Sequence, residues 1–432
     1  MATETSSATK KDYINCFLES IADSSETVYL VFFGIYVATS LILKVSWNLP
    51  WPNVIWFLRV GMTSAVLWGG TVYLFGILFK FCQKMDLKIF LIPIGIVMMV
   101  IVTLFSRSMS QNAFNIVMDI FFCCMAYKKN YKNILRVALI ISLSTLAIGT
   151  IGVAAGFTKD ILIYKPNRID AVHSFGSIYP NTWGYIAFLI VLITWYLYFR
   201  DRMVFLIIFF WIFAWFMYGV LSCKTISLLS AVFPFLSILT GKLEKKGDEN
   251  NRILSRIGGG VFTFFPIIMF GFTMFLCWQM DWIQKHFYST RLLSLAMRFV
   301  EGGYALRQNE IQLWGHELYF SQDFGVSYQD QITNFIDSPF VAYLITRGIL
   351  WMIICLVWLV YANKKCMEIR DYRLLAISTC MMVLAIMERP ALDVWYNFVL
   401  LFPLSVSINR GNRGNSNDQT KSGISKPAEC IG

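Results

Sequence analysis

Runs of about twenty apolar residues recur along this chain, and no other feature constrains its fold as strongly. Apolar residues make up 57% of the 432 positions and charged residues only 15%, whereas a water-soluble chain carries about a quarter charged residues. A helix needs about 20 apolar residues to cross roughly 30 Å of hydrocarbon. Backbone groups in lipid must be satisfied within the protein, so these runs are expected to be helices. The sequence therefore predicts an all-α polytopic membrane protein.

Twelve segments have the composition of transmembrane helices, and together they define a membrane domain over residues 27–408. The leader 1–26 is polar and lacks the cleavage site of a signal peptide, so the first segment is expected to be retained. The tail 409–432 is rich in Gly, Ser and Asn and is predicted to be disordered. The segments are 27–45, 54–79, 87–105, 111–127, 134–157, 182–199, 203–220, 223–240, 257–279, 338–361, 373–388 and 391–408.

Lysine and arginine residues in the connections predict the orientation of these segments. If the N-terminus is cytoplasmic, every inner connection is basic, and the inner connections hold most of the 37 lysines and arginines. Both termini are therefore predicted to be cytoplasmic. The formal charge of +11 is explained by this topology and by contact with anionic membrane lipids, so it does not indicate a nucleic-acid partner.

Two predicted outer connections, 158–181 and 280–337, are much longer than the others. The first contains the polar, turn-rich stretch "RIDAVHSFGSIYPNTWG" at residues 168–184. The second contains a predicted amphipathic helix over 290–301, which the pair Gly302-Gly303 is expected to end. Long loops in compact proteins tend to carry function, so the two loops are the expected location of the functional site.

Several cationic side chains lie in or beside these predicted outer loops. Arginine binds phosphate through planar, permanently charged hydrogen bonds, and fixed cations stabilise the charge that develops on a leaving group. A lipid-linked diphosphate would satisfy all of these side chains without a metal or other cofactor. The alternatives are that Arg298 pairs with Glu301 one turn on and that Arg291 binds lipid headgroups. The predicted diphosphate-binding residues are Arg168, Lys224, Arg291, Arg298 and Arg307.

The order of five segments resembles that of the Wzy-type polysaccharide polymerases of Gram-positive bacteria, which are relatives of the O-antigen ligases. The first, "HSFGSIYPNTWG", is similar to a family motif that has a second histidine where this chain has Tyr179. In the second, "LSCKT", Lys224 stands where arginine is usual. The remaining three are "STRLLSLAMRFVEGGYALRQNEIQLWGHEL", "IDSPFVAYLITRGIL" and "AIMERPALDVWYNFVLLFPL".

The resemblance implies a GT-C-like membrane fold and a metal-independent, inverting glycosyltransferase in the bacterial cytoplasmic membrane. Such an enzyme joins oligosaccharide repeat units carried on undecaprenyl diphosphate, at the outer face of the membrane. The implied products are capsule, exopolysaccharide or O-antigen. A chain-length-regulating copolymerase and a flippase are implied as partners by the family alone.

Three residues are candidates for the base that deprotonates the acceptor hydroxyl. Asp337 is the first choice, because it lies where the second long loop enters a segment and because a histidine occupies the matching place in the related ligases. The alternative is that Asp337 caps the helix that starts at Pro339. His173 and His316 are the other candidates.

Three further residues are predicted to position the substrate. Tyr179 and Asn181 close the first long loop and are expected to orient sugar or diphosphate oxygens. The alternative is that Asn181 or Thr182 caps a helix. Glu388 is expected either to pair with Arg389 or to position an arginine of the active site.

Two other functional classes share parts of this pattern. A lipid-linked oligosaccharide flippase or another secondary transporter also has about twelve segments, and charges inside them line its pathway. The uneven outer loops and the lack of an internal repeat weigh against a transporter. An O-antigen-ligase-type transferase shares nearly all the chemistry and differs in its acceptor. The charges inside the segments are Arg59, Asp119, Lys224 and Arg347, of which Arg59 and Asp119 are expected to find partners within the bundle.

Overall fold

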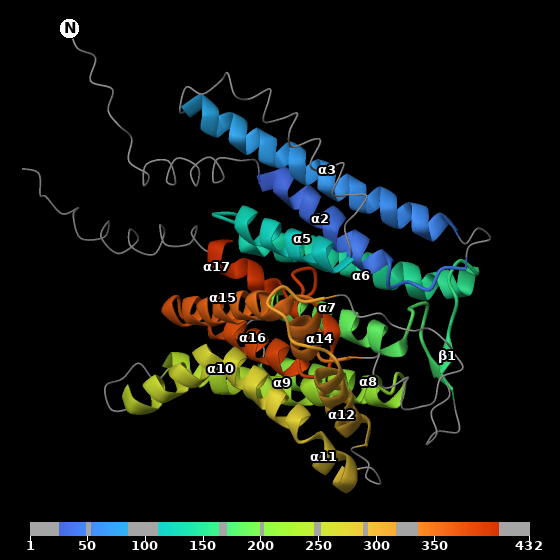
Figure 1. Cartoon of the computed structure of the whole chain (residues 1–432), viewed down its shortest axis with the longest axis vertical. Helices are drawn as coiled ribbons and strands as arrows, with labels where there is room; N and C mark the ends of the chain where they lie inside the picture. The colour runs from blue at the N-terminus through green and yellow to red at the C-terminus, as the bar shows by residue number, and fades with distance from the viewer. Residues whose placement is uncertain are drawn as a thin grey trace, which may run out of the picture.

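The computed structural model describes residues 26–48, 53–84, 111–163, 171–198, 203–245, 252–287, 293–316 and 336–405. Within these ranges the chain is mostly helical, and Figure 1 shows the longer helices lying side by side, roughly parallel or antiparallel to one another. The elements are α2 (Glu26–Ile42), α3 (Asn53–Lys84), α5 (Gln111–Met125), α6 (Tyr131–Ala155), β1 (Leu162–Ile163), β2 (Val172–His173), α7 (Pro180–Tyr198), α8 (Met203–Gly219), α9 (Lys224–Lys245), α10 (Arg252–Trp278), α11 (Met280–Phe287), α12 (Leu293–Gln308), α14 (Pro339–Thr346), α15 (Gly348–Glu368), α16 (Tyr372–Leu384), η3 (Arg389–Leu392), η4 (Phe398–Leu401) and α17 (Phe402–Ser405).

The described part of the chain contains five helices that are long and apolar enough to cross a membrane. The other apolar helices are shorter, at 10–17 residues, and include α2 and most of α9. The predicted segment 87–105 lies outside the described residues, so the count of twelve segments remains a prediction. The five are Thr63–Lys80, Tyr131–Ala155, Pro180–Tyr198, Gly259–Trp278 and Gly348–Glu368.

One end of the bundle carries the short antiparallel hairpin β1–β2, and we call it the hairpin end. The hairpin lies in the predicted loop 158–181, so the all-α prediction misses a small element there. This loop is bound to the connection between α2 and α3, because the Ser46 amide donates to the Gly176 carbonyl at 2.7 Å and the Lys159 amide donates to the Ser46 carbonyl at 2.7 Å. The φ of Gly176 is +81°, and a Cβ there would lie 2.1 Å from the Gly149 carbonyl oxygen, so only glycine fits against α6.

The predicted helix over 290–301 does not end at Gly302-Gly303, and that prediction is wrong. Helix α12 continues through both glycines to Gln308. Both glycines are buried, and a Cβ on Gly303 would lie 2.4 Å from the Cys277 carbonyl oxygen of α10. The missing side chains therefore allow α12 to pack closely against the end of α10, instead of ending the helix.

The predicted segment 338–361 is two helices rather than one. α14 ends at Thr346, α15 begins at Gly348, and Gly348 has a φ of +86°, which breaks the helical path. Backbone groups at the break are bound by the segment that follows α12. The amides of Ile349 and Leu350 donate to the carbonyls of Gln312 and Leu313 at 3.1 and 3.2 Å, and the His316 amide donates to the Ile345 carbonyl at 3.0 Å.

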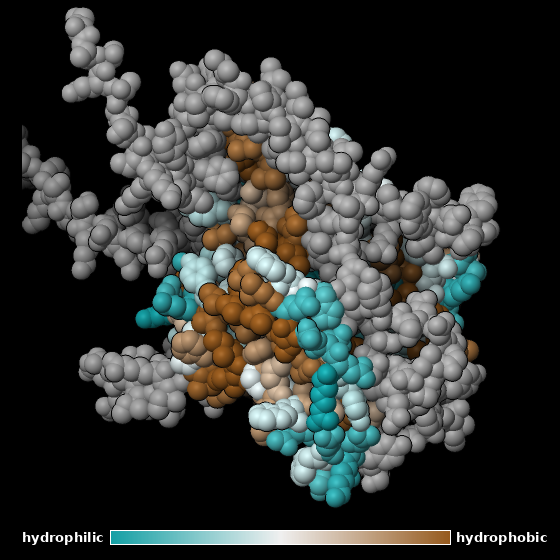
Figure 2. Space-filling model, in the orientation of Figure 1, coloured by the Kyte–Doolittle hydropathy of each residue, from teal (hydrophilic) through white to brown (hydrophobic). Residues whose placement is uncertain are grey.

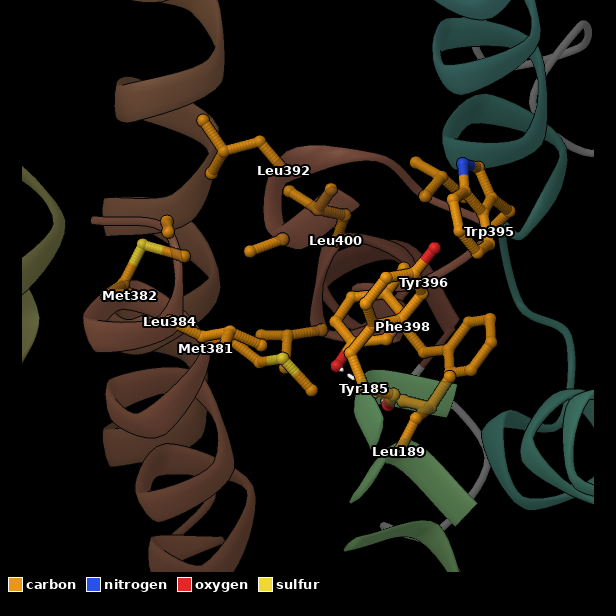
Figure 3. Close-up of a cluster of buried hydrophobic side chains, with 14 of the residues drawn as sticks. Tyr185, Leu189, Met381, Met382, Leu384, Leu392, Trp395, Tyr396, Phe398 and Leu400 are labelled. Atoms are coloured by element: carbon orange, nitrogen blue, oxygen red, sulfur yellow. Dashed lines mark hydrogen bonds between the residues drawn. The ribbon is translucent and has the colours of Figure 1, made fainter. Parts of the chain in front are cut away.

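The predicted transmembrane helix 391–408 is also wrong over its described part. Residues 389–405 form two 3-10 turns, extended backbone and one turn of α-helix, and residues 391–403 are all buried. Figure 3 shows this segment between α16, which contributes Met381 and Met382, and α7, which contributes Tyr185 and Leu189. Apolar composition predicts burial here correctly but not helix, because irregular backbone is tolerated at membrane depth where protein surrounds it.

Side chains of the surrounding helices bind the backbone of this irregular segment. The Tyr131 hydroxyl donates to the Phe398 carbonyl at 3.3 Å, and the Trp358 indole donates to the Leu400 carbonyl at 2.7 Å. The Tyr396 hydroxyl in turn donates to the Tyr185 carbonyl at 3.0 Å. The first two bonds satisfy carbonyls of the irregular segment, and the third ties the segment to α7.

Candidate active site

Arg298 of α12 is the centre of a charged cluster at the hairpin end. Its Nε lies 3.0 Å from an Asp337 carboxylate oxygen, and its Nη1 lies 3.2 Å from a Glu388 carboxylate oxygen. The same Nη1 donates to the Met387 carbonyl at 2.6 Å. We call Arg298, Asp337 and Glu388, together with Glu301 one turn along α12, the Arg298 cluster. It joins α12, the residue pair before α14 and the loop after α16.

The pairing of these residues decides between alternatives that the sequence leaves open. Glu388 binds Arg298, which lies 90 positions away; that Arg298 belongs to an active site remains a prediction. Asp337 is not the helix cap, because Ser338 occupies the N-cap position of α14 and Pro339 its first turn. The Asp337 side chain is thus directed to Arg298.

Burial and neighbouring charges set the protonation of the cluster. Burial raises the pKa of the Asp337 carboxyl, although the Arg298 and Arg389 guanidiniums oppose this shift. Burial and the Asp337 charge raise the pKa of Glu301 to about 7, again against Arg298. A carboxylate with a raised pKa is a stronger base, and the side chain of Asp337 remains 20% exposed. The arrangement therefore holds an accessible carboxylate that is able to accept a proton.

The beginnings of α7 and α9 extend this site along the hairpin end. The Thr225 hydroxyl of α9 lies 3.4 Å from the Met387 sulfur, next to Glu388. The Cys223 thiol, just before α9, lies 3.4 Å from the Asn181 amide oxygen of α7. Lys224, the first residue of α9, is exposed. Asn181 thus contacts the residue before Lys224, and the residue after Lys224 contacts Met387 beside the Arg298 cluster.

The start of α7 differs from its predicted capping arrangement. α7 begins at Pro180, so Asn181 and Thr182 lie inside its first turn and neither is the cap. Tyr179 directly precedes the helix and its side chain is 55% exposed. Both predicted positioning residues are therefore at the hairpin end, where Tyr179 is exposed and Asn181 is half-buried.

The structure does not bring the other predicted residues into the Arg298 cluster. Arg307 forms an exposed ion pair with Asp281 at 2.7 Å. His316 lies at the break between α14 and α15, where its Nε2 is 3.2 Å from the Asn309 amide oxygen and its Nδ1 has no partner among the described residues. Arg168 and Arg291 lie outside the described residues.

His173 forms a pair with Asp160 that sequence reasoning missed. The Asp160 carboxylate binds His173 Nδ1 and also accepts the backbone amides of Ser174 and Phe175 at 2.9 Å. Burial acts to raise the pKa of Asp160, but the bonds from His173 and the two amides together outweigh it, so the pKa is lowered. A carboxylate that fixes one imidazole nitrogen and leaves the other exposed is a common arrangement for a general base. The one clue to Asp160 in the sequence is that it lies in the same predicted loop as His173.

A second charged cluster lies within the bundle at the break between α14 and α15. Arg347 is fully buried and binds Asp393 at 2.8 Å and Asp119 at 3.5 Å. Asp119 also accepts the Tyr36 hydroxyl at 3.2 Å, which confirms the prediction that Asp119 finds partners within the bundle. We call Arg347, Asp119 and Asp393 the Arg347 cluster. The guanidinium also lies 3.6 Å from the centre of the Tyr343 ring, so the cluster is closed rather than open to a pathway.

The raised pKa of Glu301 predicts a pH dependence of stability. The folded protein retains the proton between pH 4.5 and about 7, where an unfolded glutamate has lost it, so the free energy of unfolding falls as pH rises through this interval. We expect Glu301→Gln to reduce this slope in thermal unfolding measured from pH 4 to about 8. The exposed Glu368→Gln is the matched control. Equal slopes in the wild type and Glu301→Gln would contradict the placement of Glu301 beside Asp337.

Comparison with known proteins does not assign this chain to a family. No protein-family model matches the sequence, no curated protein is similar to it, and no solved structure matches the fold.

Proposed function

We propose that this chain is an integral-membrane glycosyltransferase that polymerises lipid-linked oligosaccharides at the hairpin end of the bundle. The observation that carries the proposal is the pairing of Arg298 with both Asp337 and Glu388. Three segments far apart in the sequence converge to hold one partly exposed carboxylate at the end of a bundle of apolar helices. Such a site suits a substrate that has a lipid anchor in the membrane and a sugar outside it.

In this proposal Asp337 accepts the proton of an acceptor hydroxyl, whose oxygen attacks the anomeric carbon of the donor sugar. The bond between that carbon and the diphosphate oxygen breaks, and its electron pair leaves with the diphosphate. A single in-line displacement inverts the anomeric configuration and requires no covalent enzyme intermediate. Glu388 and Arg298 hold Asp337 in place for this step.

The paired state of Arg298 changes the role that we assign to it. Two carboxylates already neutralise its charge, so Arg298 is better suited to position Asp337 than to bind a diphosphate. Lys224 is exposed and its neighbour Thr225 contacts Met387, so we assign phosphate binding to Lys224. Arg168 and Arg291 remain predicted phosphate ligands by sequence alone.

A secondary transporter is the second candidate, and the Arg347 cluster favours it. Transporters bind ions or substrates where helices are broken within the membrane, and ionisable residues there are usually functional. The cluster lies at such a break. Among the described residues, however, the cluster is enclosed by side chains, whereas the Arg298 cluster retains an exposed carboxylate, and we therefore favour the transferase.

Deletion of the gene distinguishes these functions, with surface glycans analysed by gel electrophoresis. For a polymerase we expect the ladder of long chains to collapse to a single repeat unit on its carrier, and the wild-type gene to restore it. Repeat units that accumulate inside the cell would contradict the polymerase and indicate a flippase. Full-length polymer that stays on its lipid carrier would instead indicate a ligase, whose acceptor is a different molecule.

A further inference from the structure

The segment that follows α12, residues 309–316, has no role in the proposed reaction. After Gln308 the chain runs to the junction of α14 and α15, where its backbone binds the ends of both helices. Gly315 and Gly348 cross in van der Waals contact, and a Cβ on Gly348 would lie 2.3 Å from the Leu313 carbonyl oxygen. Both glycines have positive φ, at +72° and +86°, so only residues without a side chain fit at this crossing.

This junction lies at the opposite end of α14 from Asp337. α14 begins two residues after Asp337 and has eight residues, which at 1.5 Å per residue separates its two ends by about 12 Å. α15 then continues as one of the helices able to cross a membrane. The ends of a broken helix have unpaired backbone groups that lipid does not satisfy. The segment supplies these partners, and so it has to lie at the depth of the break.

Three large apolar side chains of the segment are exposed, beside the exposed polar side chains of Glu310 and Gln312. Trp314 is 75% exposed, Leu313 53% and Ile311 45%. They continue the exposed apolar face of α15, where Ile353 is 53% and Val357 is 61% exposed. Figure 2 shows hydrophobic surface over α15 bordered by hydrophilic residues over α11 and α12. The exposed apolar face of α15 thus lies next to the exposed apolar side chains of this segment, because Ile349 and Leu350 at the start of α15 are hydrogen-bonded to Gln312 and Leu313.

We propose that residues 309–316 form a re-entrant segment whose side chains at 311, 313 and 314 insert among the acyl chains of the bilayer leaflet at the hairpin end. The occupant of this surface is bulk membrane lipid, because the surface is continuous with the exposed face of α15. Transfer of three large apolar side chains from water into lipid favours this position. The predicted loop 280–337 is thus anchored in the membrane at 309–316 and is not wholly extracytoplasmic.

Photo-crosslinking of the full chain in lipid bilayers tests this inference. p-Benzoylphenylalanine replaces Trp314 in one variant and Leu313 in a second, and each protein is reconstituted in phosphatidylethanolamine and phosphatidylglycerol bilayers. The same label at Ile353 is the lipid-facing control, and at the exposed Lys159 of the hairpin loop it is the aqueous control. After irradiation, phospholipid adducts are measured by mass spectrometry.

We expect adduct yields at 313 and 314 to match that at 353 and to exceed that at 159 several-fold. Yields at both positions equal to that at 159 would overturn the proposal, because they would place the segment in water. If position 353 also gives no phospholipid adduct, the proposal is overturned because this face of α15 does not contact lipid. Both labelled positions are exposed, so the substitutions remove no packing contact from the core. The result is independent of the polymerase proposal, since it needs no substrate.

Discussion

Arg347→Met is expected to destabilise the protein by about 3–5 kcal/mol, because it leaves two buried carboxylates without their cation. Asp393 and Asp119 both bind this guanidinium, and its side chain is fully buried. Removal of one partner from a buried ion pair leaves an uncompensated charge in a medium that solvates it poorly. Thermal unfolding of the purified protein in detergent or nanodiscs measures the loss.

Two variants show whether this effect arises from the buried charges. Arg307→Met breaks an exposed ion pair with Asp281 and is expected to change the stability by less than about 1 kcal/mol. The triple variant Arg347→Met, Asp119→Asn, Asp393→Asn removes the charges together and is expected to recover much of the lost stability. If the triple variant is no more stable than Arg347→Met, the loss comes from packing around the arginine and not from charge.

The second large effect is expected on activity, from Asp337→Asn. An amide does not accept the hydroxyl proton, and loss of a general base lowers the rate by about 10²–10⁴-fold. The amide oxygen still accepts a hydrogen bond from Arg298, so the variant is expected to fold. Polymer formed by complemented deletion cells or by membranes supplied with lipid-linked repeat units measures the rate.

Asp281→Asn is the matched control for this experiment, because Asp281 is an exposed aspartate that pairs with an arginine outside the Arg298 cluster. It is expected to retain wild-type polymer. Wild-type polymer from Asp337→Asn as well would exclude Asp337 as the base. The pair of His173 and Asp160 would then be the remaining arrangement of base and orienting carboxylate among the described residues.

The helical regions were predictable because their apolar runs are long and unbroken by charge. The backbone conformation of two segments could not be predicted from the sequence. Residues 391–405 are as apolar as a transmembrane helix, but their backbone is satisfied by Tyr131, Trp358 and other side chains distant in sequence. The break at Gly348 depends on its crossing with Gly315, and a single glycine in an apolar run does not reveal that contact.

The candidate site was predictable in its residue types more than in its pairing. Charged residues near the ends of apolar runs are conspicuous, so Arg298, Asp337 and Glu388 could all be named from sequence. Their mutual contacts depend on how α12, α14 and α16 pack, which composition does not encode. The Arg347 cluster was harder still, because the 228 positions between Asp119 and Arg347 leave no local signal of their contact.

The irregular segment 389–405 also constrains the order in which the protein folds. It follows in sequence every helix to which it is hydrogen-bonded, and its own backbone hydrogen bonds form short separate turns and not one continuous α-helix. It cannot enter the membrane as an independent helix does, because its amides and carbonyls would reach lipid unpaired. The earlier helices must assemble first and leave room between α7, α15 and α16, so that completion of the bundle is a late step governed by contacts distant in sequence.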